Sequence, residues 1–226
     1  MRANFDDAWS SLHAAPRRSL ELAYMSLAAG GLAVGAVLTE SNGMIVAEGR
    51  NRAYDPPGGS DVLQGTPLAH AEMNVLAAVR TEAELGDCIL WSTQEPCSMC
   101  SAAAAFTGVG ELRHIAPDPW TIAAQAEDPS VEASKALRSV GPAEDEWVVC
   151  ANVFFLLGVA TKRGRDAPVL QHNLDHEPET AGIIVELLQH GQTAELWTSG
   201  RAVEEALADT WPRILTAAGA RRQRLG

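Results

Sequence analysis

A strand–helix–strand unit constrains the fold of this chain more than any other feature. The apolar segments CILWST (88–93) and ELRHIA (111–116) each have the length and composition of a buried strand. Between them, PCSMCSAAAAFTG (96–108) begins with proline and is rich in alanine, which is typical of a helix. A helical crossover between strands of one sheet makes those strands parallel. The sequence therefore predicts an α/β fold.

The segments before this unit predict an antiparallel edge for the same sheet. LAVGAVLTE (32–40) and MIVAEGRN (44–51) resemble two strands joined by the turn SNG, and an amphipathic helix over 16–29 precedes them. A further helix is predicted from Thr66 to about Glu82, and PWTIAAQAE after the last strand is predicted to open another. The whole predicts a three-layer α/β/α sandwich around a mixed sheet.

The character of the sequence changes near residue 141. From there on, the segments with clear periodicity all resemble helices, and WVVCANVFFLLGVA (147–160) has the composition of a buried one. We therefore predict two parts: a domain over residues 1–140 and an α-helical C-terminal extension over 141–226. The extension is expected to pack on the domain or on a partner subunit, and it carries no recognisable chemistry.

Charge and hydropathy limit the expected partners. The formal net charge of the 226-residue chain is −12, which favours a small substrate over a nucleic-acid polymer. The basic clusters at Arg17–Arg18, 162–165 and 221–224 are interpreted as solvated rim or tail residues. The chain has no run of 18 apolar residues, so no membrane span is expected. The acidic N-terminus does not resemble a signal peptide. A cytoplasmic location is expected, where a close cysteine pair indicates metal or redox chemistry.

Two short motifs carry the candidate chemistry. Cys97 and Cys100 stand at a predicted helix start, where the helix dipole favours thiolates, the form that binds zinc. His70 and Glu72 lie two residues apart in the preceding helix, about 200° apart around its axis, so both could serve one site only from the helix end. A redox role for the cysteine pair and a structural zinc site with Cys88 as fourth ligand are the alternatives. Three ligands, His70, Cys97 and Cys100, would leave a zinc position open for water, with Glu72 as proton carrier.

These motifs carry a family resemblance. HAE followed by PCSMC matches the H-x-E…P-C-x-x-C signature of zinc-dependent base deaminases. The chain resembles the cytidine deaminase superfamily over roughly residues 16–125, including VGAVL and STQEPCSMC, and is most similar in pattern to the branch of guanine, cytosine and tRNA adenosine deaminases. HAEMN also resembles deoxycytidylate deaminases. The family fold is the same α/β/α sandwich.

The resemblance implies roles for four further residues. It places Asn51 against the substrate base or sugar and the backbone N–H of Ala71 against the reacting base. It also implies that Trp120 stacks on the base and that Asp118 assists proton transfer. The residues themselves allow other interpretations: Asn51 as a turn residue, Asp118 as a helix cap and Trp120 as core packing.

The expected function is zinc-dependent hydrolytic deamination of a small nucleobase or nucleoside, with release of ammonia and with guanine or a related heterocycle favoured. The alternatives are a cytosine, cytidine or deoxycytidylate deaminase, a tRNA adenosine deaminase-like editor, and a non-catalytic zinc protein. The resemblance also implies a homodimer. Of the remaining residues, His114 is expected in the core or at its rim, Cys88 and Cys150 are expected to be buried, and HNLDHE (172–177) is expected to be a solvated segment rather than a second metal site.

Overall fold

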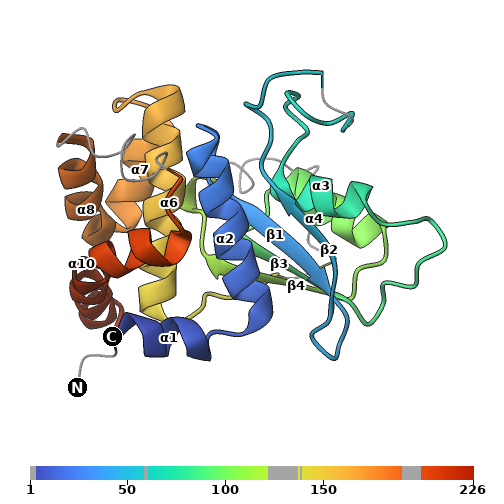
Figure 1. The fold of residues 1–226 in the computed structure, drawn as a ribbon, viewed down its shortest axis with the longest axis horizontal. Coiled ribbons are helices and arrows are strands. Elements are labelled where there is room, and N and C mark those ends of the chain that lie inside the picture. Colours follow the sequence, from blue (N-terminus) through green and yellow to red (C-terminus); the bar gives the residue numbers. More distant parts are fainter. Residues whose placement is uncertain (1–3, 59–60, 122–136, 138, 190–199) are drawn as a thin grey trace.

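The fold is built on one mixed five-stranded sheet, seen in a computed structural model that describes residues 4–58, 61–121, 137, 139–189 and 200–226 (Figure 1). The strand order is β2-β1-β3-β4-β5. Strand β1 is antiparallel to both β2 and β3, whereas β3, β4 and β5 are parallel to one another in turn. The strands are β1 (Gly35–Thr39), β2 (Ile45–Arg50), β3 (Ile89–Gln94), β4 (Glu111–Ala116) and β5 (Ser139–Val140). The predicted mixed sheet with a hairpin edge is confirmed, and the short strand β5 was not predicted.

Helices cover both faces of the sheet. Successive side chains on β3 point to opposite faces, so neighbouring residues identify the two layers. Trp91 packs beside residues of α2 (Ala14–Ala28), while Ser92 hydrogen-bonds to Glu72 on α3 (Ala71–Ala77). Helix α4 (Ser98–Phe106) lies against α3, and α6 (Asp145–Arg163) lies against α2. This arrangement is the predicted α/β/α sandwich.

The helix that carries Glu72 is shorter than predicted. It begins at Ala71 rather than Thr66 and ends at Ala77 rather than near Glu82. The carbonyl of Ala69 accepts hydrogen bonds from the Arg52 backbone N–H and the Asn74 side chain, so it does not take part in an i to i+4 helical bond. The segment from Thr66 to His70 is therefore a turn. The helix predicted after the last strand begins at Pro119, and residues 122–127 of it lie outside the described residues.

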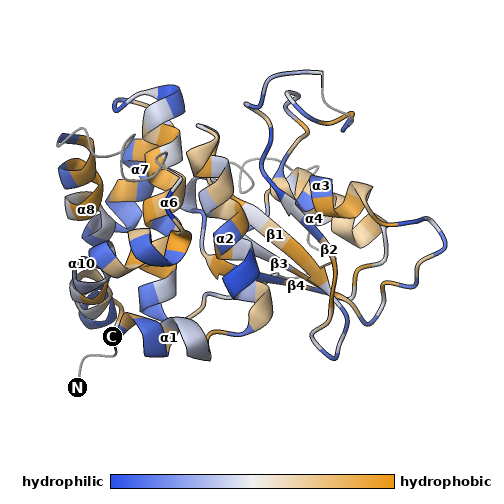
Figure 2. Ribbon diagram, viewed as in Figure 1, coloured by the Kyte–Doolittle hydropathy of each residue, from blue (hydrophilic) through white to orange (hydrophobic). Residues whose placement is uncertain are grey.

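The C-terminal helices share the core of the sheet. Every residue of α6 from Trp147 to Ala160 is buried, as predicted, and Figure 2 shows the apolar residues along α6 and the strands. Around α6 lie α7 (Pro168–His176), α8 (Pro178–Gln189) and α10 (Val203–Leu225). Helix α1 (Phe5–Ser11), which was not predicted, packs through Trp9 and Phe5 on Trp147 and Trp211. The boundary at residue 141 stays a prediction. None of the described helices is long and apolar enough to cross a membrane.

The basic tail is bound to the fold rather than solvated. Arg221 is buried, and its guanidinium donates to both carboxylate oxygens of Glu177, at 2.7 and 3.0 Å, and to Asp145. Arg222 pairs with Glu146 and Arg224 with Glu179. The prediction of a solvated tail is therefore wrong, because acidic residues on α6 and at the start of α8 neutralise it. Glu177 is likewise no part of a solvated segment, since it is buried, and residues 172–176 belong to α7.

Buried His114 makes the fold sensitive to acid. It is 7% exposed on β4, as expected of a core residue, and burial lowers its pKa from 6.5 to about 4. The unfolded chain therefore takes up this proton first, so the stabilisation is present above pH 6.5 and is lost as the pH falls toward 4. We expect His114 to account for about 2 kcal/mol of lost stability between pH 7.5 and pH 5.

Urea unfolding of wild type and His114→Gln at both pH values measures this contribution. The other titrating groups are common to the two proteins, so their difference isolates His114. Equal pH dependence in the two proteins would contradict the assignment.

Candidate metal centre

Two helix N-termini meet at the candidate metal centre. His70 is the N-cap residue of α3 and Cys97 is the N-cap residue of α4, both with extended backbones. The Nδ1 atom of His70 lies 3.8 Å from Cys97 Sγ and 3.6 Å from Cys100 Sγ, and the two sulfurs are 3.7 Å apart. Within the described part of the chain, these three residues form the only group of potential ligands that is close enough to hold one metal ion.

The spacing of the three atoms fits zinc. With Zn–S bonds of about 2.3 Å and a Zn–N bond of about 2.05 Å, a tetrahedral ion sets the sulfurs about 3.8 Å apart and each sulfur about 3.6 Å from the nitrogen. The observed distances agree with these values to about 0.2 Å. Hydrogen bonding with Cys100, and then with His70, also lowers the pKa of Cys97 to about 4, which favours the thiolate that zinc requires.

Glu72 lies beside the ligands without being one of them. It is 4% exposed, Ser92 Oγ donates to its Oε1 at 2.8 Å, and Cys100 Sγ lies 3.5 Å from its Oε2. Burial raises its pKa above the ordinary value. His70 and Glu72 can serve one site although they are two residues apart, because His70 precedes the helix and only Glu72 follows helical geometry.

Asn51 follows the end of β2 on the same side of the fold. It is 3% exposed, its Oδ1 accepts from the Ala53 backbone N–H, and its carbonyl accepts from Ser26 Oγ. The residues on either side of it connect to α3: the carbonyl of Arg50 accepts from Asn74, and the N–H of Arg52 donates to Ala69. The structure therefore brings Asn51 and buried Ala71 into the neighbourhood of His70.

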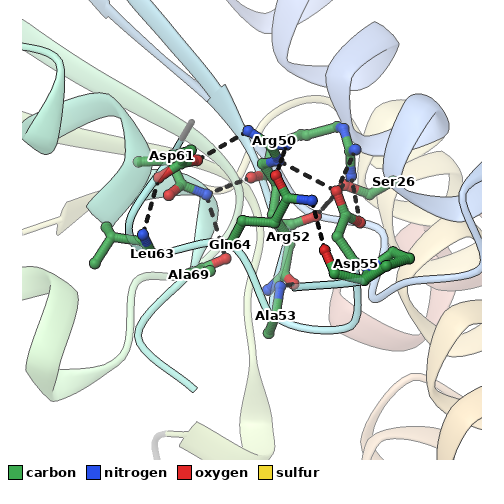
Figure 3. A network of polar contacts seen from close by, with 12 residues as sticks. Ser26, Arg50, Arg52, Ala53, Asp55, Asp61, Leu63, Gln64 and Ala69 are labelled. Atoms are coloured by element: carbon green, nitrogen blue, oxygen red, sulfur yellow. Dashed lines mark hydrogen bonds and ion pairs between the residues drawn. The ribbon is translucent and has the colours of Figure 1, made fainter. Parts of the chain in front are cut away.

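A polar network that was not predicted braces the loop leading to His70 (Figure 3). Arg50 Nη2 lies 2.6 Å from Asp55 Oδ2, and Arg52 Nη1 lies 2.9 Å from Asp61 Oδ2. Arg52 also donates to Gln64. The i, i+3 spacing of Arg52 and Asp55 was the one sequence signal for it. The network fixes the backbone that enters α3 and so positions His70.

Asp118 and Trp120 follow the end of β4. Asp118 is buried and accepts from both the backbone N–H and the hydroxyl of Thr121, which is the arrangement of a helix cap. Trp120 is 41% exposed and its ring forms a T-shaped contact with the His172 ring. Within the described residues, neither side chain hydrogen-bonds to His70, Glu72, Cys97 or Cys100.

The other cysteines and histidines form no second centre in the described structure. Cys88 and Cys150 are buried, as expected. The ring centroids of His172 and His176 lie 4.4 Å apart on α7, but the third predicted member of that group, Glu177, forms an ion pair with Arg221.

Comparisons with known proteins point to one family. Residues 10–114 match the cytidine and deoxycytidylate deaminase zinc-binding region. The tRNA(Ile)-lysidine synthase of Deinococcus radiodurans is 36% identical over 114 residues, which are 48% of this chain and 18% of that protein. The tRNA-specific adenosine deaminase of Haemophilus influenzae is 32% identical over 124 residues, which are 52% of this chain and 62% of that protein. The chain thus spans less than two thirds of either relative.

A solved structure of guanine deaminase from Bacillus subtilis is similar to part of the chain. It is 32% identical, and the match covers 50% of this chain and 67% of that one, with a TM-score of 0.39.

Proposed function

Because this chain belongs to the cytidine deaminase superfamily, we propose that it hydrolyses the exocyclic amine of a small nucleobase or nucleoside, with guanine or a related heterocycle as the favoured substrate. The reaction consumes water, leaves a carbonyl on the ring and releases ammonia. The observation that supports it best is the convergence of His70, Cys97 and Cys100 beside a buried carboxylate that is not a ligand.

The protein residues divide the work between them. His70, Cys97 and Cys100 would hold zinc, which when bound lowers the pKa of a coordinated water and so supplies a nucleophile near neutral pH. Glu72 takes a proton on Oε2, the oxygen nearest the ligands, while Ser92 fixes Oε1. It passes that proton to the ring nitrogen beside the amine-bearing carbon, and a later proton to the departing amine.

The remaining residues are proposed to bind the substrate. Asn51 and the backbone N–H of Ala71 would orient the base beside Glu72, and Asp118 and Trp120 would line the approach. Four free cysteines accord with a proposed cytoplasmic location. A homodimer is proposed from family resemblance alone.

A second candidate is a nucleic-acid editor. The similarity to a tRNA-specific adenosine deaminase favours it, and the net charge of −12 opposes it.

Ammonia release from a panel of substrates tests the proposal. Zinc-loaded protein is incubated with free bases, nucleosides, nucleotides and tRNA, with the Glu72→Gln variant as the blank. We expect release from a small substrate, and most from a purine base. Release from tRNA alone would favour the second candidate, and release from nothing in the panel would refute both.

A further inference from the structure

A cavity at the C-terminal end of α6 lies outside the metal-ligand set. Its volume is about 340 Å³, within the range of small-molecule sites. Among the described residues that line it, Arg163 is the one that carries a charge. The rest of the wall is apolar and comes from α6, the start of α7, the segment before β1 and Trp120; it includes Leu32, Phe155, Val159, Ala167 and Val169.

Arg163 has donors to spare. Its Nε donates to Tyr54 Oη at 2.9 Å, which leaves both terminal nitrogens of the guanidinium free of any hydrogen bond to the described residues. Lys162 Nζ lies 5.4 Å from the centre of the Tyr54 ring, so a second cation faces the same tyrosine. Tyr54 belongs to the braced loop that leads to His70. The two cations therefore contact the loop that leads to the metal centre.

These cations differ from Arg18 and from the arginines of the tail. Arg18 pairs with Glu21 and Glu48, and the arginines of the tail pair with acidic residues. In contrast, neither Lys162 nor Arg163 forms an ion pair with any described carboxylate. Their position in the last turn of α6 suits the helix dipole, which accounts for positive charge there. The dipole does not explain why an open apolar cavity lies beside the guanidinium of Arg163.

Trp120 supplies a flat face at this cavity. Its ring is 41% exposed and forms a T-shaped contact with the His172 ring, with ring centroids 5.7 Å apart. An exposed indole beside a free guanidinium matches a ligand that combines a planar ring with an anion, because rings stack on tryptophan and arginine binds phosphate with two parallel hydrogen bonds.

We propose that this cavity binds a mononucleotide, with its base against Trp120 and the apolar wall and its phosphate on Arg163. The volume suits one base rather than a run of bases, and the net charge of −12 opposes a polyanion. This site rests on the proposed function only in sharing Trp120, which is also proposed to line the approach to the metal centre. It goes beyond that function because binding here needs neither zinc nor turnover.

Calorimetric titration of the full chain tests the site. The Glu72→Gln background is used so that no ligand is consumed, and the ligands are AMP, GMP, CMP and UMP, their nucleosides and a single-stranded oligoribonucleotide. At least one mononucleotide should bind more tightly than its nucleoside, and binding should weaken with salt. Arg163→Gln should weaken the binding of that mononucleotide by about tenfold or more and change nucleoside binding less than twofold. Trp120→Ala should weaken the binding of both the mononucleotide and its nucleoside.

The matched control is Arg80→Gln, because Arg80 is an exposed arginine far from the cavity residues in the sequence and 87% exposed. Melting temperatures confirm that each variant is folded. Equal effects of Arg163→Gln and Arg80→Gln would overturn the site, as would the absence of binding by all four mononucleotides. Much tighter, Arg163-dependent binding of the oligoribonucleotide would overturn the mononucleotide assignment. None of these outcomes depends on whether the wild type releases ammonia.

Discussion

Glu72→Gln is expected to lower turnover by roughly 10²–10⁴-fold while zinc content and melting temperature stay close to those of the wild type. The amide keeps the volume of the carboxylate, and its oxygen can still accept the hydrogen bond from Ser92. It cannot accept the proton that the reaction must move. The loss can exceed this range if Glu72 handles several proton transfers in one cycle.

Zinc content, thermal unfolding and ammonia release are measured side by side on the two proteins. Ser92→Ala is the informative companion, since it removes the hydrogen bond to Oε1 and leaves the carboxylate in place. It should lower turnover less than Glu72→Gln does. If Glu72→Gln stays active, another residue carries the proton, and buried Asp118 becomes the next candidate.

The parts of this site that could be predicted from the sequence are those set by local pattern. Cys97 and Cys100 follow a proline at a helix start, and HAE precedes an apolar helix, so the two motifs could be assigned to neighbouring helix ends. The start of α3 could not be predicted, because it depends on the hydrogen bonds that the Arg52 backbone and the Asn74 side chain both donate to the carbonyl of Ala69. That contact joins segments whose proximity exists only in the folded chain.

The same reason explains the elements that were missed. Helix α1 is stabilised by Trp9 against Trp147, more than 130 residues along the chain, and no local periodicity signals that contact. The basic tail was also missed because its contacts are tertiary, since Asp145 on α6 and Glu177 between α7 and α8 neutralise Arg221. Composition predicted the buried helix α6, because every residue from Trp147 to Ala160 except Asn152 is apolar.

Cys97→Ala is expected to abolish zinc binding, whereas Cys88→Ala should leave about one zinc per chain. The three-ligand set loses a thiolate in the first variant, and two ligands hold zinc too weakly to survive purification. Cys88 precedes β3 while Cys97 lies beyond its other end, and a strand of six residues spans about 20 Å, so Cys88 cannot reach the centre. The structural-zinc alternative, in which Cys88 is the fourth ligand, therefore makes the opposite prediction for Cys88→Ala.

Elemental analysis and thermal unfolding decide between these alternatives. Because the bound ion joins the N-termini of α3 and α4, the melting temperature of Cys97→Ala should fall, and a chelator should lower that of the wild type to a similar value. The chelator should then have little effect on Cys97→Ala. Zinc loss in Cys88→Ala equal to that in Cys97→Ala would show that the centre is closed by four protein ligands. With no position open for water, such a centre would be structural, and the proposed hydrolysis would have no nucleophile.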